Sequence, residues 1–319
     1  MNGNNLNVRY RRNAYAKKRI KVIAFIVGGA VIVLAILFLV FGGILKDKVD
    51  DDRNEDATRT DQVSDTAPER QEVASVNGYG FSLVGATNSA ISEKATEIQS
   101  KGGNSISFMT RDESGNELFS SSVARGMNKQ GSSSGYVAID SVATRAENKG
   151  LRACAIVPID SFLEKDELYR SVLLSYDAAI CAELVRDGAD DVLVLLRGTQ
   201  VDEEKTDELL RLARAVKENE SEAVIGIALT REMLESEGSE SIVARLWEEY
   251  DFLALDMTAI EADDDPLTFA QESVSSEIHY YLLRYNMRVL LPSLDEKAHG
   301  DMVSVLVGKG LDNWQTVVK

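Results

Sequence analysis

The chain has 319 residues and a net charge of −17, with 52 acidic residues against 35 basic ones. This charge argues against a nucleic-acid partner, because binding to phosphates depends on clustered Lys and Arg. Two cysteines and two histidines cannot form a disulfide framework or a HExxH zinc site, so we expect buried free thiols at Cys154 and Cys181 and no metal.

The first predicted element is a membrane helix over residues 22–41, which read VIAFIVGGAVIVLAILFLVF. Roughly twenty apolar residues cross a bilayer core of about 30 Å. Seven basic residues and no acidic ones precede this run, so the rest of the chain carries −24. Because positive flanks stay inside, we expect a single-pass cell-membrane protein with a cytoplasmic tail (residues 1–21) and an extracellular C-terminal domain. A cleaved signal peptide is disfavoured, since no A-x-A-like site follows Phe41.

The next segment, residues 42–77, predicts an acidic, flexible stalk. From Lys46 to Glu72 it is polar and nearly devoid of large apolar residues. Such a composition cannot bury enough surface to offset the entropy of ordering.

The remaining residues, 78–319, predict a (β/α)8 barrel of the TIM type. Short apolar runs alternate with amphipathic stretches such as Lys205–Glu218, Ser241–Tyr250 and Phe269–Tyr285, a pattern typical of a parallel sheet covered by helices. Eight such runs in about 240 residues match a barrel, and an open doubly wound sheet is the alternative. The predicted strands are Phe81–Val84, Ser105–Met109, Leu151–Pro158, Val192–Leu196, Ala223–Leu229, Phe252–Met257, Arg288–Pro292 and Trp314–Val318.

Two segments depart from a regular barrel. No helix follows the eighth run before Lys319, so we expect a helix over Ala67–Val76 to fill the gap between strands eight and one. The polar segment Asp112–Gly135 predicts a hairpin or loop after the second strand.

Candidate functional residues follow from the rule that TIM barrels carry their reactive groups at the C-terminal ends of the strands. The candidate catalytic acids are Asp256, Asp112 and Asp160. The candidate ligand-binding residues are Arg111, Arg197 and Glu232.

Asp256 is the sharpest of these candidates, because it interrupts the apolar run FLALDM. We expect it to be partly buried at the barrel mouth with Arg197 as its partner. An internal Asp–Arg pair that only holds the barrel together is the other interpretation. The literal G-x-S-x-G match at residues 131–135 lacks a preceding strand and predicts a Ser/Gly loop, and no nucleotide-binding fingerprint points to a cofactor.

The segment NSISFMTRDESGNELFSS, residues 104–121, resembles a family of glycoside-hydrolase-like TIM barrels from membrane-anchored or secreted proteins of Gram-positive bacteria. Residues 151–160 and 188–197 extend the likeness, which spans Gly78 to Leu291. The resemblance implies a barrel fold and glycoside hydrolysis. It also implies acids in the second and fourth strands, where this chain has Met109, Leu195 and Leu196. These side chains cannot transfer a proton.

Three functions remain open. The first is a degenerate glycosidase-like barrel that binds an envelope polysaccharide, peptidoglycan, or a membrane or wall protein. The second is an active glycosidase that uses Asp256 with Asp112 or Asp160. The third is a structural or signalling ectodomain. In each case residues 22–41 hold the chain in the lipid bilayer.

Overall fold

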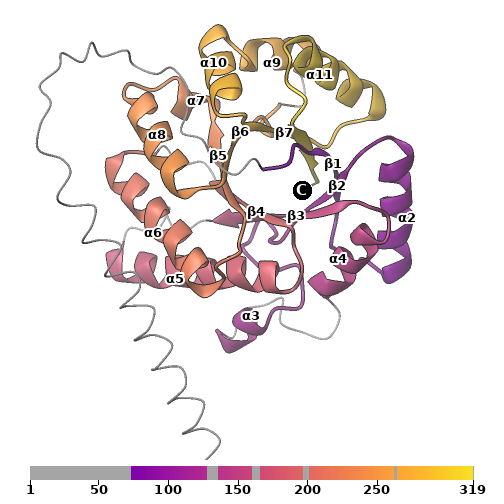
Figure 1. Ribbon diagram of the computed structural model, residues 1–319, viewed down its shortest axis with the longest axis vertical. Helices are drawn as coiled ribbons and strands as arrows, with labels where there is room; N and C mark the ends of the chain where they lie inside the picture. The colour runs from indigo at the N-terminus through magenta and orange to yellow at the C-terminus, as the bar shows by residue number, and fades with distance from the viewer. Residues whose placement is uncertain (1–72, 128–135, 160–165, 197–200, 262–263, 319) are drawn as a thin grey trace, which may run out of the picture. The chain divides into compact units, whose positions relative to one another are not determined.

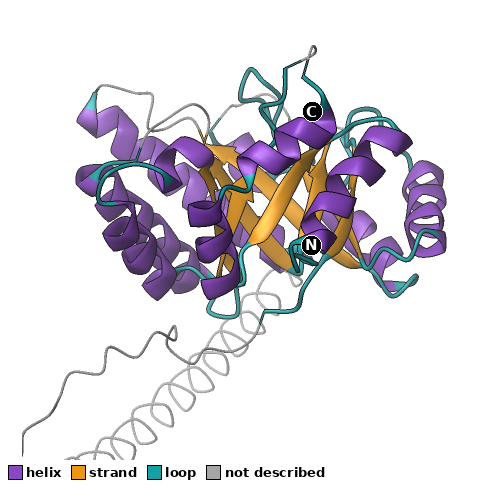
Figure 2. Ribbon diagram, turned by 90° about the horizontal axis from the view of Figure 1, so that it is seen from above, coloured by secondary structure: helices purple, strands orange, loops and turns teal. Residues whose placement is uncertain are grey.

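The computed structural model describes residues 73–127, 136–159, 166–196, 201–261 and 264–318. Contacts divide the chain into two units, residues 1–64 and 65–319, and every described residue lies in the second. Its parallel strands close into a barrel in chain order, and helices surround them (Figure 1, Figure 2). The predicted (β/α)8 barrel is therefore confirmed, and the open doubly wound sheet is wrong.

The described residues contain eight strands: β1 Asn77–Phe81, β2 Ser105–Met109, β3 Arg152–Ile159, β4 Asp191–Leu196, β5 Ile225–Thr230, β6 Phe252–Asp256, β7 Arg288–Pro292 and β8 Trp314–Val317. The helices in the described residues are α2 Asn88–Ser100, α3 Ser122–Gly126, α4 Ile139–Glu147, α5 Glu167–Arg186, α6 Glu203–Asn219, α7 Arg231–Leu234, α8 Ser239–Glu249, α9 Pro266–Ser273, α10 Ser276–Arg284 and α11 Glu296–Gly308.

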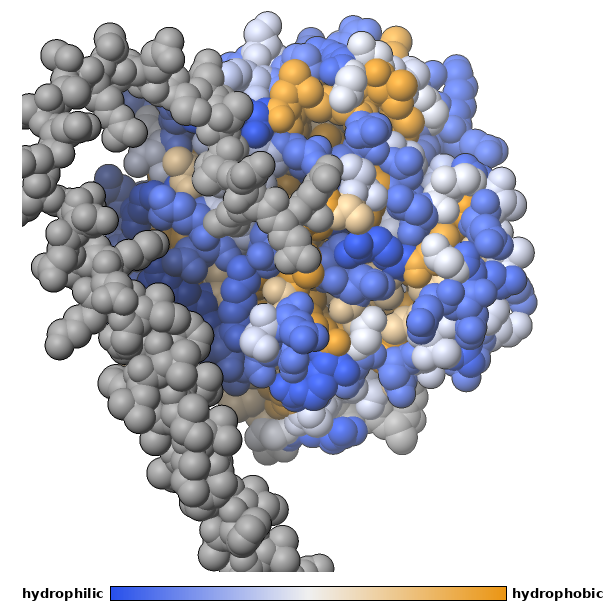
Figure 3. Space-filling view, in the orientation of Figure 1, coloured by the Kyte–Doolittle hydropathy of each residue, from blue (hydrophilic) through white to orange (hydrophobic). Residues whose placement is uncertain are grey.

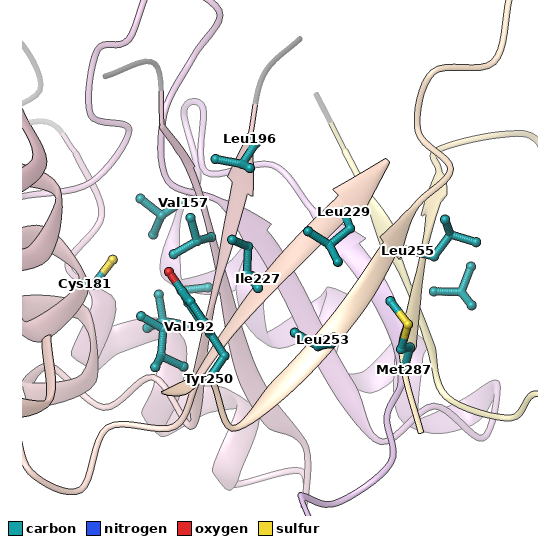
Figure 4. Packing of buried hydrophobic residues seen from close by; sticks show 14 of the residues in the cluster. Val157, Cys181, Val192, Leu196, Ile227, Leu229, Tyr250, Leu253, Leu255 and Met287 are labelled. Atoms are coloured by element: carbon teal, nitrogen blue, oxygen red, sulfur yellow. The ribbon is translucent and has the colours of Figure 1, made fainter. Parts of the chain in front are cut away.

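The strands form two apolar clusters, one inside the barrel and one between the barrel and the helices. Alternate strand residues point to opposite faces. The inner cluster comprises Met109, Ile156, Leu193, Leu195, Ala228, Phe252, Ala254, Leu290 and Val317. Figure 4 shows members of the outer cluster, among them Val192, Ile227 and Leu253, with Cys181 facing them from α5. Because both faces are buried, the strands read as continuous apolar runs.

Polar groups occupy the lumen at the N-terminal ends of the strands. Arg288 Nη1 donates to Asp191 Oδ1 at 3.1 Å and to Gln315 Oε1 at 3.0 Å. The Cys154 thiol donates to Asp191 Oδ2 at 3.5 Å. Cys154 and Cys181 are both buried free thiols, as predicted, and burial raises the pKa of each.

The outer helices follow the predicted amphipathic stripes, with one correction. The stripe over Lys205–Glu218 lies in α6 and the one over Ser241–Tyr250 lies mostly in α8. The stretch Phe269–Tyr285 is two helices rather than one, because Ser275 caps the N-terminus of α10 by accepting from the Ile278 N–H. A serine hydroxyl competes in this way with the continuation of a helix.

The start of the barrel differs from the prediction. β1 covers Asn77–Phe81, earlier than the apolar run Phe81–Val84, and pairs with β8 through Asn77 and Trp314. Residues 73–76 form no helix, so the described part of the expected Ala67–Val76 helix is wrong. The reason is that their backbone binds the barrel: Val76 N–H donates to Asn313 Oδ1 at 3.1 Å, and Ser75 C=O accepts from Asn104 at 3.0 Å. The first six residues of that prediction lie outside the described residues.

The polar segment after β2 begins with the predicted hairpin. Arg111 and Glu117 form an antiparallel bridge, and α3 follows. Residues 128–135, which include the whole Ser/Gly loop at residues 131–135, lie outside the described residues.

The predicted membrane helix, the cytoplasmic tail and most of the stalk also lie outside the described residues. Of the helices that the structure describes, none combines the length and the apolarity needed to cross a bilayer.

One face of the barrel unit is largely hydrophilic, with apolar residues over α9 and α10 at the top of the view in Figure 3. Leu267 and Leu283 are exposed at 39% and 55% of their surface on these two helices. Scattered exposed leucines are normal for a soluble surface.

Candidate functional site

A cavity of about 530 Å³ opens at the C-terminal ends of the strands, and we call it the mouth cavity. This volume lies within the roughly 300–1,000 Å³ of typical ligand sites, and the position is where TIM barrels bind their ligands. Its main apolar lining residues are Leu83, Val84, Met109, Leu118, Leu195 and Leu196. Its main polar lining residues are Arg111, Asp112, Glu113, Thr230, Glu232 and Asp256.

The floor of the mouth cavity is apolar where the family resemblance implies acids. Met109 ends β2 and Leu195 lies near the end of β4, and both belong to the inner cluster of the barrel. They are exposed by only 6% and 5% of their surface. A reacting bond placed on this floor would meet a thioether and a methyl group, neither of which exchanges protons.

Asp256 and Glu232 come together on the β5–β6 side of the mouth cavity. Asp256 ends β6 and pairs in register with Thr230, which ends β5, and Glu232 follows two residues later on α7. Asp256 is partly buried, as predicted, and its Oδ1 accepts from the Thr258 N–H at 2.8 Å. Glu232 is exposed at the rim. Two carboxylates, one at the end of β6 and one on the helix that follows β5, thus line one concave site.

Arg111 lines the mouth cavity, and its guanidinium is held by hydrogen bonds to a network of buried residues. Its Nε donates to Glu117 Oε1 at 2.6 Å, and its Nη1 donates to Asp177 Oδ1 at 2.6 Å and to the Pro158 C=O at 3.0 Å. The Tyr176 hydroxyl donates to Glu117 Oε1 at 2.8 Å, and the Arg111 guanidinium lies 5.2 Å from the centroid of the Tyr176 ring.

The carboxylates in this network oppose the effect of burial on the pKa of Arg111. Burial by itself would lower the pKa of Arg111, but the carboxylates of Asp177 and Glu117 raise the pKa above its ordinary value. Burial also raises the pKa of Glu117 despite the neighbouring guanidinium. The network therefore fixes the hairpin after β2 to α5. Among the described residues, the buried Nη2 of Arg111 has no acceptor and the buried Oε2 of Glu117 has no donor.

Asp112 lies at the rim and organises the hairpin. Its Oδ1 accepts from the backbone N–H of Ser114 at 2.9 Å and of Asn116 at 2.8 Å, and its Oδ2 accepts from the Asn116 amide at 2.9 Å. This is an Asx-type turn, in which the side chain replaces a backbone acceptor. The carboxylate predicted as catalytic is thus already held by three hydrogen bonds.

Several other polar residues at the strand ends cap helices. Asp202, Thr230 and Asp295 accept from the first turns of α6, α7 and α11 respectively. The predicted site residues Asp160 and Arg197 lie outside the described residues. The expected pair between Arg197 and Asp256 therefore stays a prediction.

Sequence reasoning missed the buried partners of Arg111, although a signal was present. Asp177 interrupts the apolar sequence of α5 and is 3% exposed, just as Asp256 interrupts the run of β6. A charged residue in an apolar stretch predicts a buried partner, but the partner comes from a distant part of the chain. Glu117, 60 residues before Asp177, carries no such signal in its polar loop.

Metal ligation finds no support in the ranges that the structure describes. They hold no group of three or more His, Cys, Asp or Glu side chains placed to bind one ion.

Comparisons with known proteins show the fold. No family model matches the chain, and no curated protein matches it. A Bacteroides thetaiotaomicron protein assigned as an α-L-fucosidase is similar in structure, with a TM-score of 0.54 and 10% identity over 79% of this chain and 89% of that one.

Two further solved structures are similar. An FMN-binding β-glucuronidase of Facaelibacterium prausnitzii has a TM-score of 0.50 and 10% identity over 77% of this chain and 38% of that one. A deoxyribose phosphate aldolase of Aeropyrum pernix has a TM-score of 0.47 and 15% identity over 75% and 84%. At these identities the likeness to the first two structures shows the TIM-barrel fold alone, and it does not select a reaction.

Proposed function

We propose that this chain is a membrane-anchored extracytoplasmic barrel that binds a cell-envelope ligand without cleaving it. The ligand is an envelope polysaccharide, peptidoglycan, or a membrane or wall protein. The observation that carries the proposal is the apolar floor of the mouth cavity, where Met109 and Leu195 lie. Glycoside hydrolysis needs two carboxyl groups flanking the scissile bond. A cavity that keeps the volume of a ligand site but has thioether and methyl groups on its floor is suited to binding.

The anchoring part of the proposal rests on the apolar run 22–41 and the basic residues before it. Alkaline carbonate extraction of cell membranes and protease treatment of intact protoplasts test it together. We expect the chain to stay in the extracted membranes and the barrel to be digested from outside. Release by carbonate, or protection of the barrel in intact protoplasts, would overturn the anchoring.

A second candidate is an active glycoside hydrolase, and one observation favours it: Asp256, Glu232 and Asp112 line the same cavity. The sequence predicts Asp256 paired with Asp112 or Asp160. Asp112 is already hydrogen-bonded within its turn, and Asp160 lies outside the described residues.

One experiment separates the two candidates. The purified full chain in detergent is incubated with insoluble peptidoglycan and with insoluble polysaccharides, and both retained protein and released reducing ends are measured. We expect retention without release. Release that disappears in Asp256→Asn but persists in Glu272→Gln, an exposed carboxylate on α9, would establish the hydrolase instead.

A matched pair of variants tests whether the mouth cavity does the binding. Val84 is 69% exposed and lines the cavity, whereas Val172 is 42% exposed on α5 and does not line it. Val84→Trp should therefore fill the cavity and reduce retention, and Val172→Trp should leave it unchanged. Equal retention of both variants would contradict binding at the mouth.

A further inference from the structure

We infer that His299 makes the closure of the barrel sensitive to acid, because protonation of its ring loosens the seam between β1 and β8. This inference goes beyond the proposed function, since it holds whichever ligand the mouth cavity binds. His279 and His299 are the only histidines in the sequence, so a matched control is available.

The seam between β1 and β8 is the shortest strand pairing in the barrel. Its register covers two residue pairs, the second being Gly78 with Gln315, whereas every other pair of neighbouring strands shares three or more. Side chains hold the rest of the seam. The Gly80 N–H donates to the Thr316 hydroxyl, and Val318 packs so closely on Gly80 that an added Cβ would lie 2.5 Å from it. Segments with few backbone hydrogen bonds open at a low free energy.

His299 extends from α11 onto both strands of this seam. The centroid of its ring lies 5.4 Å from that of Tyr79 on β1 and 5.1 Å from that of Trp314 on β8. It lines a cavity of about 270 Å³ with residues of α2, which we call the side cavity. Val318 lines both the side cavity and the mouth cavity. The seam beside His299 is therefore part of the wall of the mouth cavity.

The surroundings of His299 favour the neutral ring. Its Nε2 is buried and has no hydrogen-bond partner among the described residues. Burial, together with the charge of Lys101 on α2, lowers the pKa of His299 below its ordinary value of 6.5. Protonation would leave a charged N–H group buried without an acceptor, and it would place a second cation near Lys101.

The neighbouring groups do not compensate this added charge. The charged and titratable side chains that line the side cavity with His299 are Tyr79, Lys94, Glu97, Lys101 and Glu296. Glu97 already binds Lys94 and Lys101 at 3.1 Å each, and Glu296 is 89% exposed. The face of the Tyr79 ring could attract an imidazolium, but the Lys101 Nζ already lies 5.8 Å from its centroid. The helix α9, which packs against α11, carries Glu272 as its one charged residue, and Glu272 is exposed.

The sign of the effect follows from these surroundings. In the open seam His299 regains its ordinary pKa, so below pH 6.5 the open form binds a proton that the closed form lacks. The free energy of opening therefore falls as the pH falls through this window. Opening separates Tyr79 from Trp314 and displaces Val318 from the wall of the mouth cavity.

Hydrogen exchange followed by mass spectrometry tests this on the full chain in detergent, at pH 7 and pH 5 and corrected for the intrinsic exchange rates. From pH 7 to pH 5 we expect the amides of β1, β8 and α11 to lose about threefold to tenfold more protection than those of β4 and β5. His299→Phe keeps an aromatic ring without a charge and should remove this extra loss. The control His279→Gln should retain it.

A second variant and a second measurement keep the test sharp if the Phe ring disturbs the packing. His299→Gln also removes the charge and should abolish the extra loss. Carbon-13 NMR of labelled histidine in His279→Gln reports on His299 alone, and we expect its titration midpoint below pH 6.5.

Three results would each overturn the inference: a midpoint at or above pH 6.5, no extra loss of protection in the wild type, or the same extra loss in both His299 variants. None of these measurements uses a ligand. Failure of the inference would therefore leave the proposed binding function standing, and failure of polymer binding would leave the acid-sensitive seam standing.

Discussion

Arg288 and Asp191 form an ion pair across the lumen of the barrel, from the first residue of β7 to the first residue of β4. The Nη1–Oδ1 distance is 3.1 Å, and the side chains are 1% and 0% exposed. The guanidinium also lies 4.1 Å from the centroid of the Phe252 ring. This is an internal Asp–Arg pair of the kind expected at Asp256, but it lies at the opposite end of the barrel.

Removal of one partner of this pair should destabilise the fold strongly. Asp191→Asn leaves the Arg288 charge buried without compensation, so we expect the free energy of unfolding to fall by about 3–5 kcal/mol. Urea denaturation followed by circular dichroism measures this loss. The double variant Asp191→Leu with Arg288→Met should lose less than the single one, because no fully buried charge is left unpaired: Arg152, the other partner of Asp191, is partly exposed to solvent. The control Glu97→Gln removes an exposed partner of Lys94 and should cost less than about 1 kcal/mol.

Glu117 should make the stability depend on pH. Burial raises the pKa of this carboxyl above its ordinary 4.5, with Arg111, Asp177 and Tyr176 facing it. The folded chain therefore keeps a proton that the unfolded chain loses, and the contribution of Glu117 to the unfolding free energy falls as pH rises from the ordinary pKa to the raised one.

The variant Glu117→Gln isolates this effect. The difference in unfolding free energy between the wild type and the variant should change with pH in that window and become constant above it. Denaturation curves at a series of pH values measure the difference, with Glu272→Gln as the control. A difference that is independent of pH would contradict the raised pKa.

Asp112 should behave as a turn residue. Asp112→Ala removes an acceptor from three hydrogen bonds, so we expect the hairpin to loosen and the unfolding free energy to fall by about 1–3 kcal/mol. Asp112→Asn keeps one oxygen acceptor and should lose less. Hydrogen exchange at the amides of Ser114 and Asn116 reports on the turn directly, and unchanged protection in Asp112→Ala would contradict this role.

Two glycine substitutions should have opposite effects. A Cβ at Gly226 in β5 would lie 2.3 Å from the Phe252 ring, so Gly226→Ala should displace the ring from Arg288 and cost about 1–3 kcal/mol. A Cβ at Gly300 in α11 meets nothing within 4 Å, so Gly300→Ala should stabilise the chain by about 0.5–1 kcal/mol. Thermal unfolding of the two variants tests this contrast. Equal shifts of the melting temperature in both variants would contradict it.

The barrel could be predicted from the sequence because the burial of its strands and helices leaves a periodic pattern of apolar residues. Strands such as β4 are buried on both faces, so residues 191–196 read as a nearly continuous apolar run. Boundaries set by single polar groups were harder to predict. Ser275 divides a stretch that is apolar at helical spacing, and β1 begins at Asn77 within a sequence containing two glycines, Gly78 and Gly80, that pack closely against the lumen.

The candidate site was only partly predictable. Asp256 was expected at the barrel mouth because a charge interrupts an apolar run, and the structure places it there. The roles of Arg111 and Asp112 could not be predicted in this way. Arg111 binds Asp177, which is 66 residues away in the chain, and the contacts of Asp112 depend on the geometry of the turn.

The sequence by itself determined that parallel strands alternate with helices, because hydrophobic burial leaves a local and repeated pattern. Only the tertiary structure decided which side chains meet. Closure of the barrel brings Met109, Leu195, Glu232 and Asp256 from four strand ends to one cavity, and it places Asp191 against Arg288. The physical reason is that pairing between distant segments depends on strand register and on the direction of each side chain, and neither leaves a local trace in the sequence.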